Sequence, residues 1–102
     1  MYLSCMNIEL MEANEQRVKI FKALADPTRI EIVRTLFLAK KELACGEVGG
    51  ICAVSKSNAS YHFRTLREAG LIKVRKHAQT KYTTLDEATL RKYLPGFLET
   101  LL

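Results

Sequence analysis

The stretch SKSNASYHFRTLREAGLIKVRKHAQTKY, residues 55–82, decides the fold, because its periodicity changes from that of a helix to that of a strand. Its first residues are small and polar, its middle repeats apolar residues at helical spacing, and its end mixes apolar residues with cations. These patterns predict a helix over residues 56–69, followed directly by a β-hairpin.

The ends of this predicted helix carry the expected signals. Ser55 can cap the amino end, and Gly70 can adopt the positive φ that terminates a helix. In the hairpin, Ile72 and Val74 alternate with Lys73 and Arg75, and residues 77–79 lie near the tip. The helix side chains expected to face the core are Ala59, His62 or Phe63, and Leu66.

The segments on either side predict four more helices. Asp26 and Pro27 begin one of them, because Asp is a favoured cap and Pro at the first helical position loses no needed donor. A short helix is expected around residues 45–52, and a final one starts at Asp86 and is kinked or broken at Pro95-Gly96. The buried stripes expected in the two helices of residues 7–37 are Ile8, Met11, Val18, Phe21 and Leu24, then Ile30, Val33, Leu36 and Phe37.

The predicted order is therefore α-α-α-α-β-β-α, a mainly α fold with a small β-hairpin, in a single domain over residues 1–102. A short helix, a turn around residues 53–56 and a helix with polar first turns form a helix-turn-helix. The basic hairpin that follows has the position of a wing. The sequence predicts a winged helix-turn-helix.

The positive charge is concentrated in this same region. The chain of 102 residues has a formal net charge of +5, with 48% hydrophobic and 26% charged residues, as in folded proteins. Residues 56–82 hold seven Lys or Arg against one acidic residue, Glu68, a net charge of +6. Such a local excess is typical of a surface that binds a polyanion.

Several classes of protein are not expected. The sequence has no paired carboxylates in a suitable context, no glycine-rich phosphate loop and no metal-ligand cluster, so we expect neither catalysis nor a cofactor. The apolar runs are too short to cross a bilayer. Three cysteines without an export signal argue against a disulfide framework, and a cytoplasmic protein is expected.

Small hydrogen-bonding side chains at the start of the helix can approach base edges, while the hairpin cations can contact the DNA backbone. Some of these residues have other readings: Ser55 and Ser57 as caps, Tyr61 as a surface aromatic, and His62 as a hydrogen-bonded structural residue. The alternative function is a winged-helix module that binds protein or RNA. The candidate DNA-binding residues are Lys56, Ser57, Asn58, Ser60, Tyr61 and Arg64 in the helix, and Lys73, Arg75, Lys76, His77, Gln79 and Lys81 in the hairpin.

Residues 17–86 resemble the arsenic-repressor (ArsR-type) family of winged helix-turn-helix regulators. The segments that carry the resemblance are KALADPTR and the pattern S-x-S-x-x-S-x-H-x-x-x-L-x-x-A-G-L from Ser55 to Leu71. The resemblance implies a homodimeric repressor whose first and last helices form the dimer interface. It also implies binding to an imperfect palindrome in double-stranded DNA, with recognition helices roughly 34–36 Å apart.

The resemblance departs at the family's metal sites. Where the family's metalloid site has a Cys-x-Cys pair, this chain has Ala44 and Gly46, with Cys45 between them. The last helix, residues 86–102, contains no His for the family's second site. No metal site is therefore expected; the remaining hypothesis is soft-metal or redox sensing by the thiols of Cys45 and of Cys5 from the other subunit. Cys52 is expected in the core.

Overall fold

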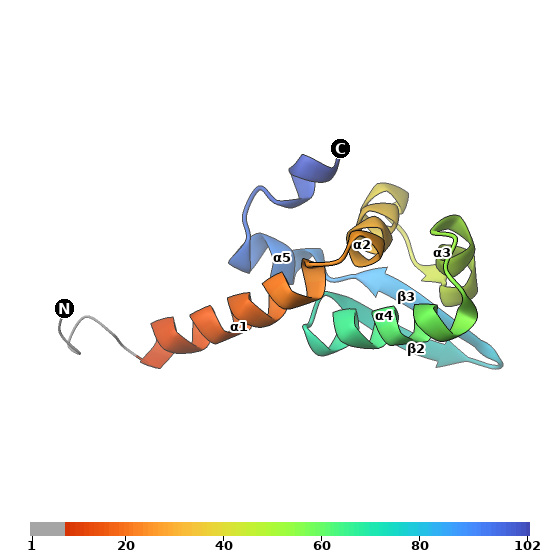
Figure 1. The fold of residues 1–102 in the computed structure, drawn as a ribbon, viewed down its shortest axis with the longest axis horizontal. Helices are drawn as coiled ribbons and strands as arrows, with labels where there is room; N and C mark the ends of the chain where they lie inside the picture. The colour runs from red at the N-terminus through yellow and green to blue at the C-terminus, as the bar shows by residue number, and fades with distance from the viewer. Residues whose placement is uncertain (1–7) are drawn as a thin grey trace.

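The computed structural model describes residues 8–102 and confirms the predicted order of helices and hairpin (Figure 1). Within this part of the chain, none of the helices combines the length and apolar character needed to cross a membrane. The elements are α1 (Ile8–Leu24), α2 (Pro27–Ala39), β1 (Leu43–Ala44), α3 (Cys45–Ile51), α4 (Lys56–Glu68), β2 (Ile72–His77), β3 (Thr80–Leu85), α5 (Glu87–Tyr93) and the 3₁₀ helix η2 (Leu98–Leu101).

The sheet has one strand more than the sequence predicts. Its order is β1-β3-β2, and both neighbouring pairs are antiparallel. The additional strand, β1, pairs Leu43 with Thr83 and Ala44 with Tyr82. Two residues are too few to show a period, so only the pairing with β3 reveals this strand. Because β1 runs directly into α3, it joins the wing to the helix-turn-helix.

The predicted helix caps are confirmed. The Asp26 carboxylate accepts hydrogen bonds from the backbone N–H groups of Thr28 and Arg29, at 2.8 and 3.1 Å. Burial would raise the pKa of Asp26, but the Arg29 backbone hydrogen bond and the Arg29 charge outweigh it, so the pKa lies below its usual value. Ser55 caps α4, and Gly70 follows it with φ +80°.

The last helix is broken rather than kinked. Asp86 caps α5 through the backbone N–H of Thr89, and α5 ends at Tyr93, before Pro95. The chain then turns back and forms η2 beside α2, where Arg34 donates a hydrogen bond to the Leu101 carbonyl at 3.0 Å. The carboxyl end of the described chain is thereby fixed to the helical side of the domain.

The buried face of α1 differs from the predicted stripe. Ile20, Ala23 and Leu24 are buried, whereas Ile8 is 71% exposed and Phe21 is 55% exposed. Of the predicted stripe only Leu24 lies in the core; Met11 and Val18 are exposed as well. The predicted helix is confirmed, but α1 has two apolar faces, and the sequence does not show which of them packs against the core of the same chain.

In α2 the stripe is mostly confirmed, since Val33, Leu36 and Phe37 are buried. The fully buried isoleucine, however, is Ile32, while Ile30 is half-buried. In α4 the sequence left open whether His62 or Phe63 faces the core, and Phe63 is the buried one. Ala59 and Leu66 are buried as predicted. These side chains form one core that lies under the sheet and between the helices.

Arg29 is a buried cation that connects three helices. It lies on α2 and is 9% exposed. Its Nε donates to the Ala23 carbonyl of α1 at 2.6 Å, and its Nη1 lies 3.1 Å from Nδ1 of His62 on α4. A guanidinium only donates, so His62 Nδ1 is the acceptor in this contact. The expectation that His62 is a hydrogen-bonded structural residue agrees with this contact.

We expect Arg29→Lys to destabilise the domain by about 2 kcal/mol, because one ammonium cannot reproduce both guanidinium contacts of a buried site. For a domain of this size the melting temperature should fall by roughly 10 °C, measured by circular dichroism. Arg67→Lys, at an exposed position of α4, is the matched control and should melt as the wild type does. Equal melting temperatures for both variants would contradict the structural role of Arg29.

Candidate nucleic-acid interface

Helix α4 presents its polar residues on the side opposite the core. Ser57, Tyr61 and Arg64 follow one another at spacings of four and three residues, and all three are exposed. Ser60 and Asn58 flank this row and are exposed too. The arrangement follows from the buried positions Ala59, Phe63 and Leu66, which fix the rotation of the helix about its axis.

Two guanidinium groups lie near Tyr61. The Cζ atoms of Arg29 and Arg64 are 5.8 and 5.9 Å from the centroid of its ring, and Tyr61 is 53% exposed. The neighbouring His62 ring is tilted by 58° against it, with centroids 5.6 Å apart. Contacts with both cations favour one orientation of the phenol.

The hairpin cations lie on two different faces of the sheet. Side chains alternate along a strand, so Val74 and Lys76 share one face, and Lys73 and Arg75 share the other. Val74 is half-buried against the core, which identifies its face as the one toward α3 and α4. Lys76 therefore points toward the helix-turn-helix, and Lys73 and Arg75 point away from it.

A cleft of ≈ 700 Å³ lies between α3, α4 and the hairpin, and we name it the helix–wing cleft. Its floor is made of small and apolar residues, among them Gly49, Ala59 and Phe63. The amino end of α4 and the hairpin tip lie at the same end of the domain (Figure 1). The predicted DNA-binding residues that line it are Lys56, Ser60, Lys76, Gln79 and Lys81.

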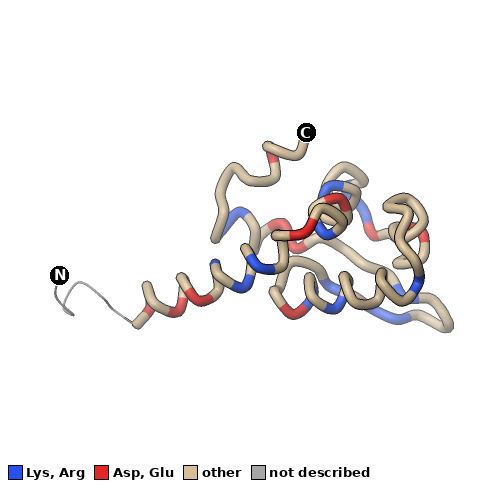
Figure 2. Tube along the Cα trace, viewed as in Figure 1, with Lys and Arg blue, Asp and Glu red and all other residues tan. Residues whose placement is uncertain are grey.

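A smaller hollow of ≈ 270 Å³ adjoins this cleft and shares Ser60 and Lys81 with it. Arg64 of α4 lines this hollow, and so does Arg67, which the sequence analysis did not select. Arg67 follows Ser60 by seven residues, two helical turns, so helical spacing from the selected residues was the signal that could have found it. Figure 2 shows the resulting run of cations along α4 and the hairpin.

Other predicted residues stand apart from the cleft. Ser57, Asn58 and Tyr61 lie on the exposed side of α4, and His77 lies at the hairpin end on the face that carries Lys73. Arg75 is paired with Glu42, the residue before β1: its Nε and Nη2 donate to the two carboxylate oxygens at 2.7 and 2.6 Å. Glu42 is a residue that the sequence analysis missed.

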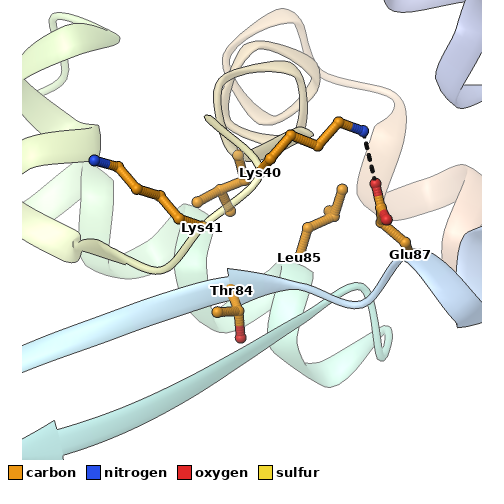
Figure 3. A pocket seen from close by; sticks show the side chains of 6 residues that line it. Lys40, Lys41, Thr84, Leu85 and Glu87 are labelled. Carbon is orange, nitrogen blue, oxygen red and sulfur yellow. Dashed lines mark hydrogen bonds and ion pairs between the residues drawn. The ribbon is translucent and has the colours of Figure 1, made fainter. Parts of the chain in front are cut away.

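Another hollow, of ≈ 210 Å³, lies where α2, β3 and α5 meet (Figure 3). Lys40 Nζ forms an ion pair with Glu87 there at 3.2 Å, while the Lys41 side chain extends away from that pair. This hollow shares no lining residue with the helix–wing cleft. Its lysines therefore do not add to the candidate interface.

The cysteines do not form a metal centre in the described part of the chain. Cys45 and Cys52 are free thiols, and residues 8–102 contain no group of three or more His, Cys, Asp or Glu side chains that could hold a metal. Burial raises the pKa of both thiols, although the charge of Lys81 acts to lower that of Cys45. Cys52 packs against the core, as expected, and Cys5 lies outside the described residues.

Comparison with known proteins supports the winged helix-turn-helix architecture described above. A family model described as a helix-turn-helix domain matches residues 24–75. A Bacillus subtilis protein described as an uncharacterized HTH-type transcriptional regulator, YceK, is 54% identical over 101 residues, covering 99% of this chain and all of that protein. The arsenical resistance operon repressor of the same species is 35% identical over 79 residues, 78% of this chain and 71% of the relative.

The transcriptional activator HlyU of Vibrio cholerae is 36% identical over 87 residues, which are 84% of this chain and 79% of the relative. Its solved structure superposes with a TM-score of 0.72 at 32% identity, covering 86% of this chain and 89% of that one. The similarity extends beyond the helix-turn-helix to most of the chain. Together with the winged architecture and the cation-lined cleft, these relatives show that this chain belongs to the ArsR-type family of winged helix-turn-helix transcriptional regulators, which bind DNA.

Proposed function

We propose that a homodimer of this chain represses transcription by binding an imperfect palindrome in double-stranded DNA. The observation that carries the proposal is the helix–wing cleft, where Lys56 and Ser60 of α4 face Lys76, Gln79 and Lys81 of the hairpin. In this arrangement α4 enters the major groove, and the adjacent backbone passes along the hairpin cations. Such a regulator would act in the cytoplasm, where it meets chromosomal DNA.

The two parts of the interface have different tasks in this proposal. Ser57, Asn58 and Tyr61 present short or planar hydrogen-bonding groups on the exposed side of α4, and they select the sequence. Lys76 and Lys81 carry full charges on the cleft side of the hairpin, and they contact phosphates. Phosphate contacts supply affinity for any duplex, whereas contacts to base edges distinguish one duplex from another.

A second copy of the chain is the partner that fits α1. Ile8, Met11, Val18 and Phe21 lie on one face of α1 and are all exposed, while Ile20, Ala23 and Leu24 cover the opposite face. The amino-terminal turns of α1 extend away from the body of the domain, at the end opposite the hairpin tip (Figure 1). A dimer built on this face buries the apolar side chains and leaves both helix–wing clefts open to DNA.

Repression is the mode of control that this arrangement favours. A dimer that binds through both helix–wing clefts covers its site, and it represses where that site overlaps the place at which transcription begins. Of the relatives named above, the Bacillus subtilis protein of the arsenical resistance operon is described as a repressor and HlyU as an activator. Thiol sensing by Cys45 with Cys5 stays a hypothesis.

The division of tasks predicts a difference between two lysines of one strand. Lys76→Ala should weaken binding to every duplex and reduce the slope of log Kd against log salt by about 1, because one phosphate contact is lost. Lys73→Ala, three residues earlier on the opposite face, should leave both quantities nearly unchanged. Fluorescence anisotropy with duplexes selected from genomic fragments by the wild-type protein gives both quantities; equal slopes for the two variants would contradict the assignment.

Asn58→Ala should act on sequence preference instead. We expect the discrimination between the selected duplex and a scrambled one to fall by about 1–3 kcal/mol, with the salt slope unchanged, because an amide contact to a base edge is removed. The measurement is competition between the two duplexes at fixed salt. Leu38→Ala, at an exposed position of α2, is the control, and loss of affinity for both duplexes alike would exclude Asn58 as a base-reading residue.

The dimer predicts an effect of charge on the exposed face of α1. Phe21→Glu should convert the protein to a folded monomer and weaken binding to a palindromic duplex by at least about 100-fold, because two linked half-site contacts become independent. Light scattering after size exclusion reports the mass. Leu38→Glu places the same charge at an exposed apolar position of α2. If Phe21→Glu stays dimeric, or if only Leu38→Glu dissociates, the interface lies elsewhere.

A further inference from the structure

The ion pair between Glu42 and Arg75 is the most completely formed one in the described chain. Both carboxylate oxygens accept from one guanidinium, at 2.6 and 2.7 Å, and the Arg75 Cζ lies 4.8 Å from the centroid of the Tyr82 ring. Bidentate pairing of this kind is directional as well as strong. The aromatic contact fixes the same guanidinium from a second side. Arg75 is thus held by two residues from two other segments.

The pair crosses the whole sheet. Arg75 lies on β2, its cross-strand partner Tyr82 lies on β3, and Glu42 precedes β1, so the guanidinium spans from one edge strand to the other in the order β2-β3-β1. Glu42 is three residues before Cys45, the first residue of α3. A displacement of the hairpin relative to the helix-turn-helix would have to break this pair or move α3 with it.

The other connection between the hairpin and the segment before α3 is strand β1, and it is weak. β1 is only two residues long, so it provides a short ladder to β3. A two-stranded hairpin has little stability of its own and depends on what it packs against. The apolar support of β2 is at its root, where Ile72 is buried and Val74 is half-buried, whereas residues 75–77 toward the tip are exposed. The Glu42–Arg75 pair therefore connects the hairpin to the segment before β1 at a position of β2 that apolar packing no longer supports.

We propose that the Glu42–Arg75 pair is the tie that sets the position of the wing over the helix–wing cleft, and that Arg75 is a positioning residue and not a phosphate contact. Arg75 lies on the sheet face opposite Lys76, away from the cleft, and the Glu42 carboxylate neutralises its charge. A phosphate that approached the guanidinium would also meet this carboxylate. The wing therefore contacts phosphates through its cleft-facing lysines while Arg75 keeps them in place.

The tie can be tested without DNA. Amide hydrogen exchange of the full chain should be faster in residues 75–82 for Glu42→Gln, and at least as fast for Arg75→Gln, which also loses the contact with Tyr82. The double variant should be no faster than Arg75→Gln, because both lack the same contacts of Arg75. Exchange in α2 and the melting temperature report whether the domain stays folded. Unchanged exchange of the wing in both single variants would overturn the proposal.

The consequence for DNA binding rests on the proposed function and is measured separately. We expect Glu42→Gln and Arg75→Gln each to weaken binding to the selected duplex by about 3–10-fold, with the salt slope of the wild type, because no phosphate contact is lost. If Arg75 contacted a phosphate, Glu42→Gln would bind more tightly and Arg75→Gln would lower the slope by about 1. Either of these results would overturn the positioning role.

A charge exchange distinguishes a tie from a mere loss of stability. The double variant Glu42→Arg with Arg75→Glu restores an ion pair at the same place, and its affinity should return to within about threefold of the wild type. Arg75→Glu alone should bind more weakly than the exchanged pair. Lys73→Ala is the matched control on the same face of β2. If the double variant with exchanged charges bound as weakly as Arg75→Glu, the positioning role of the ion pair would be contradicted. If the wild type bound no duplex, the proposed function would be rejected, and amide hydrogen exchange would still show whether the pair holds the wing.

Discussion

The contacts of Arg29 are the constraint on which the placement of α4 depends. One buried guanidinium joins the carboxyl end of α1 to α2 and to His62 of α4, and it also lies near the ring of Tyr61. A buried cation is stable only when its donors are satisfied, so these contacts specify how α4 lies against α2. The neighbouring cap at Asp26 begins α2 in the required direction. These contacts thereby determine which face of α4 is exposed.

The wing is held by a different kind of contact. Its root is part of the apolar core, but beyond Val74 the hairpin depends on cross-strand pairing and on the Glu42–Arg75 pair. Strand pairing places the wing cations on two faces of the sheet, although in the sequence they form one continuous group. In the proposed interface the cations on the cleft side of the sheet contact DNA, and Lys73 and Arg75 point away from the cleft. In that proposal the charge that faces a duplex from the cleft side is smaller than the net +6 of residues 56–82.

The parts of the fold that follow local rules were predictable. Asp26, Ser55 and Asp86 act as caps, Gly70 ends α4 with φ +80°, and the change of period after it gives the hairpin. Strand β1 was missed because two residues carry no periodic signal, and the tie from Glu42 was missed because its partner is 33 residues away. In α1 the predicted stripe was largely the exposed one, since apolar side chains for the core and for a second copy look alike in a sequence.

The sequence by itself determined the order of the elements, the positions of the helix ends, the concentration of cations and the resemblance to a family of regulators, because each depends on residues close together in the chain. Only the tertiary structure decided which of those residues act together. Strand pairing divided the wing cations between two faces, the core fixed the rotation of α4 about its axis, and Arg29 and Glu42 found partners far along the chain. Such long-range contacts have no local signature, since they depend on where the backbone places side chains in space.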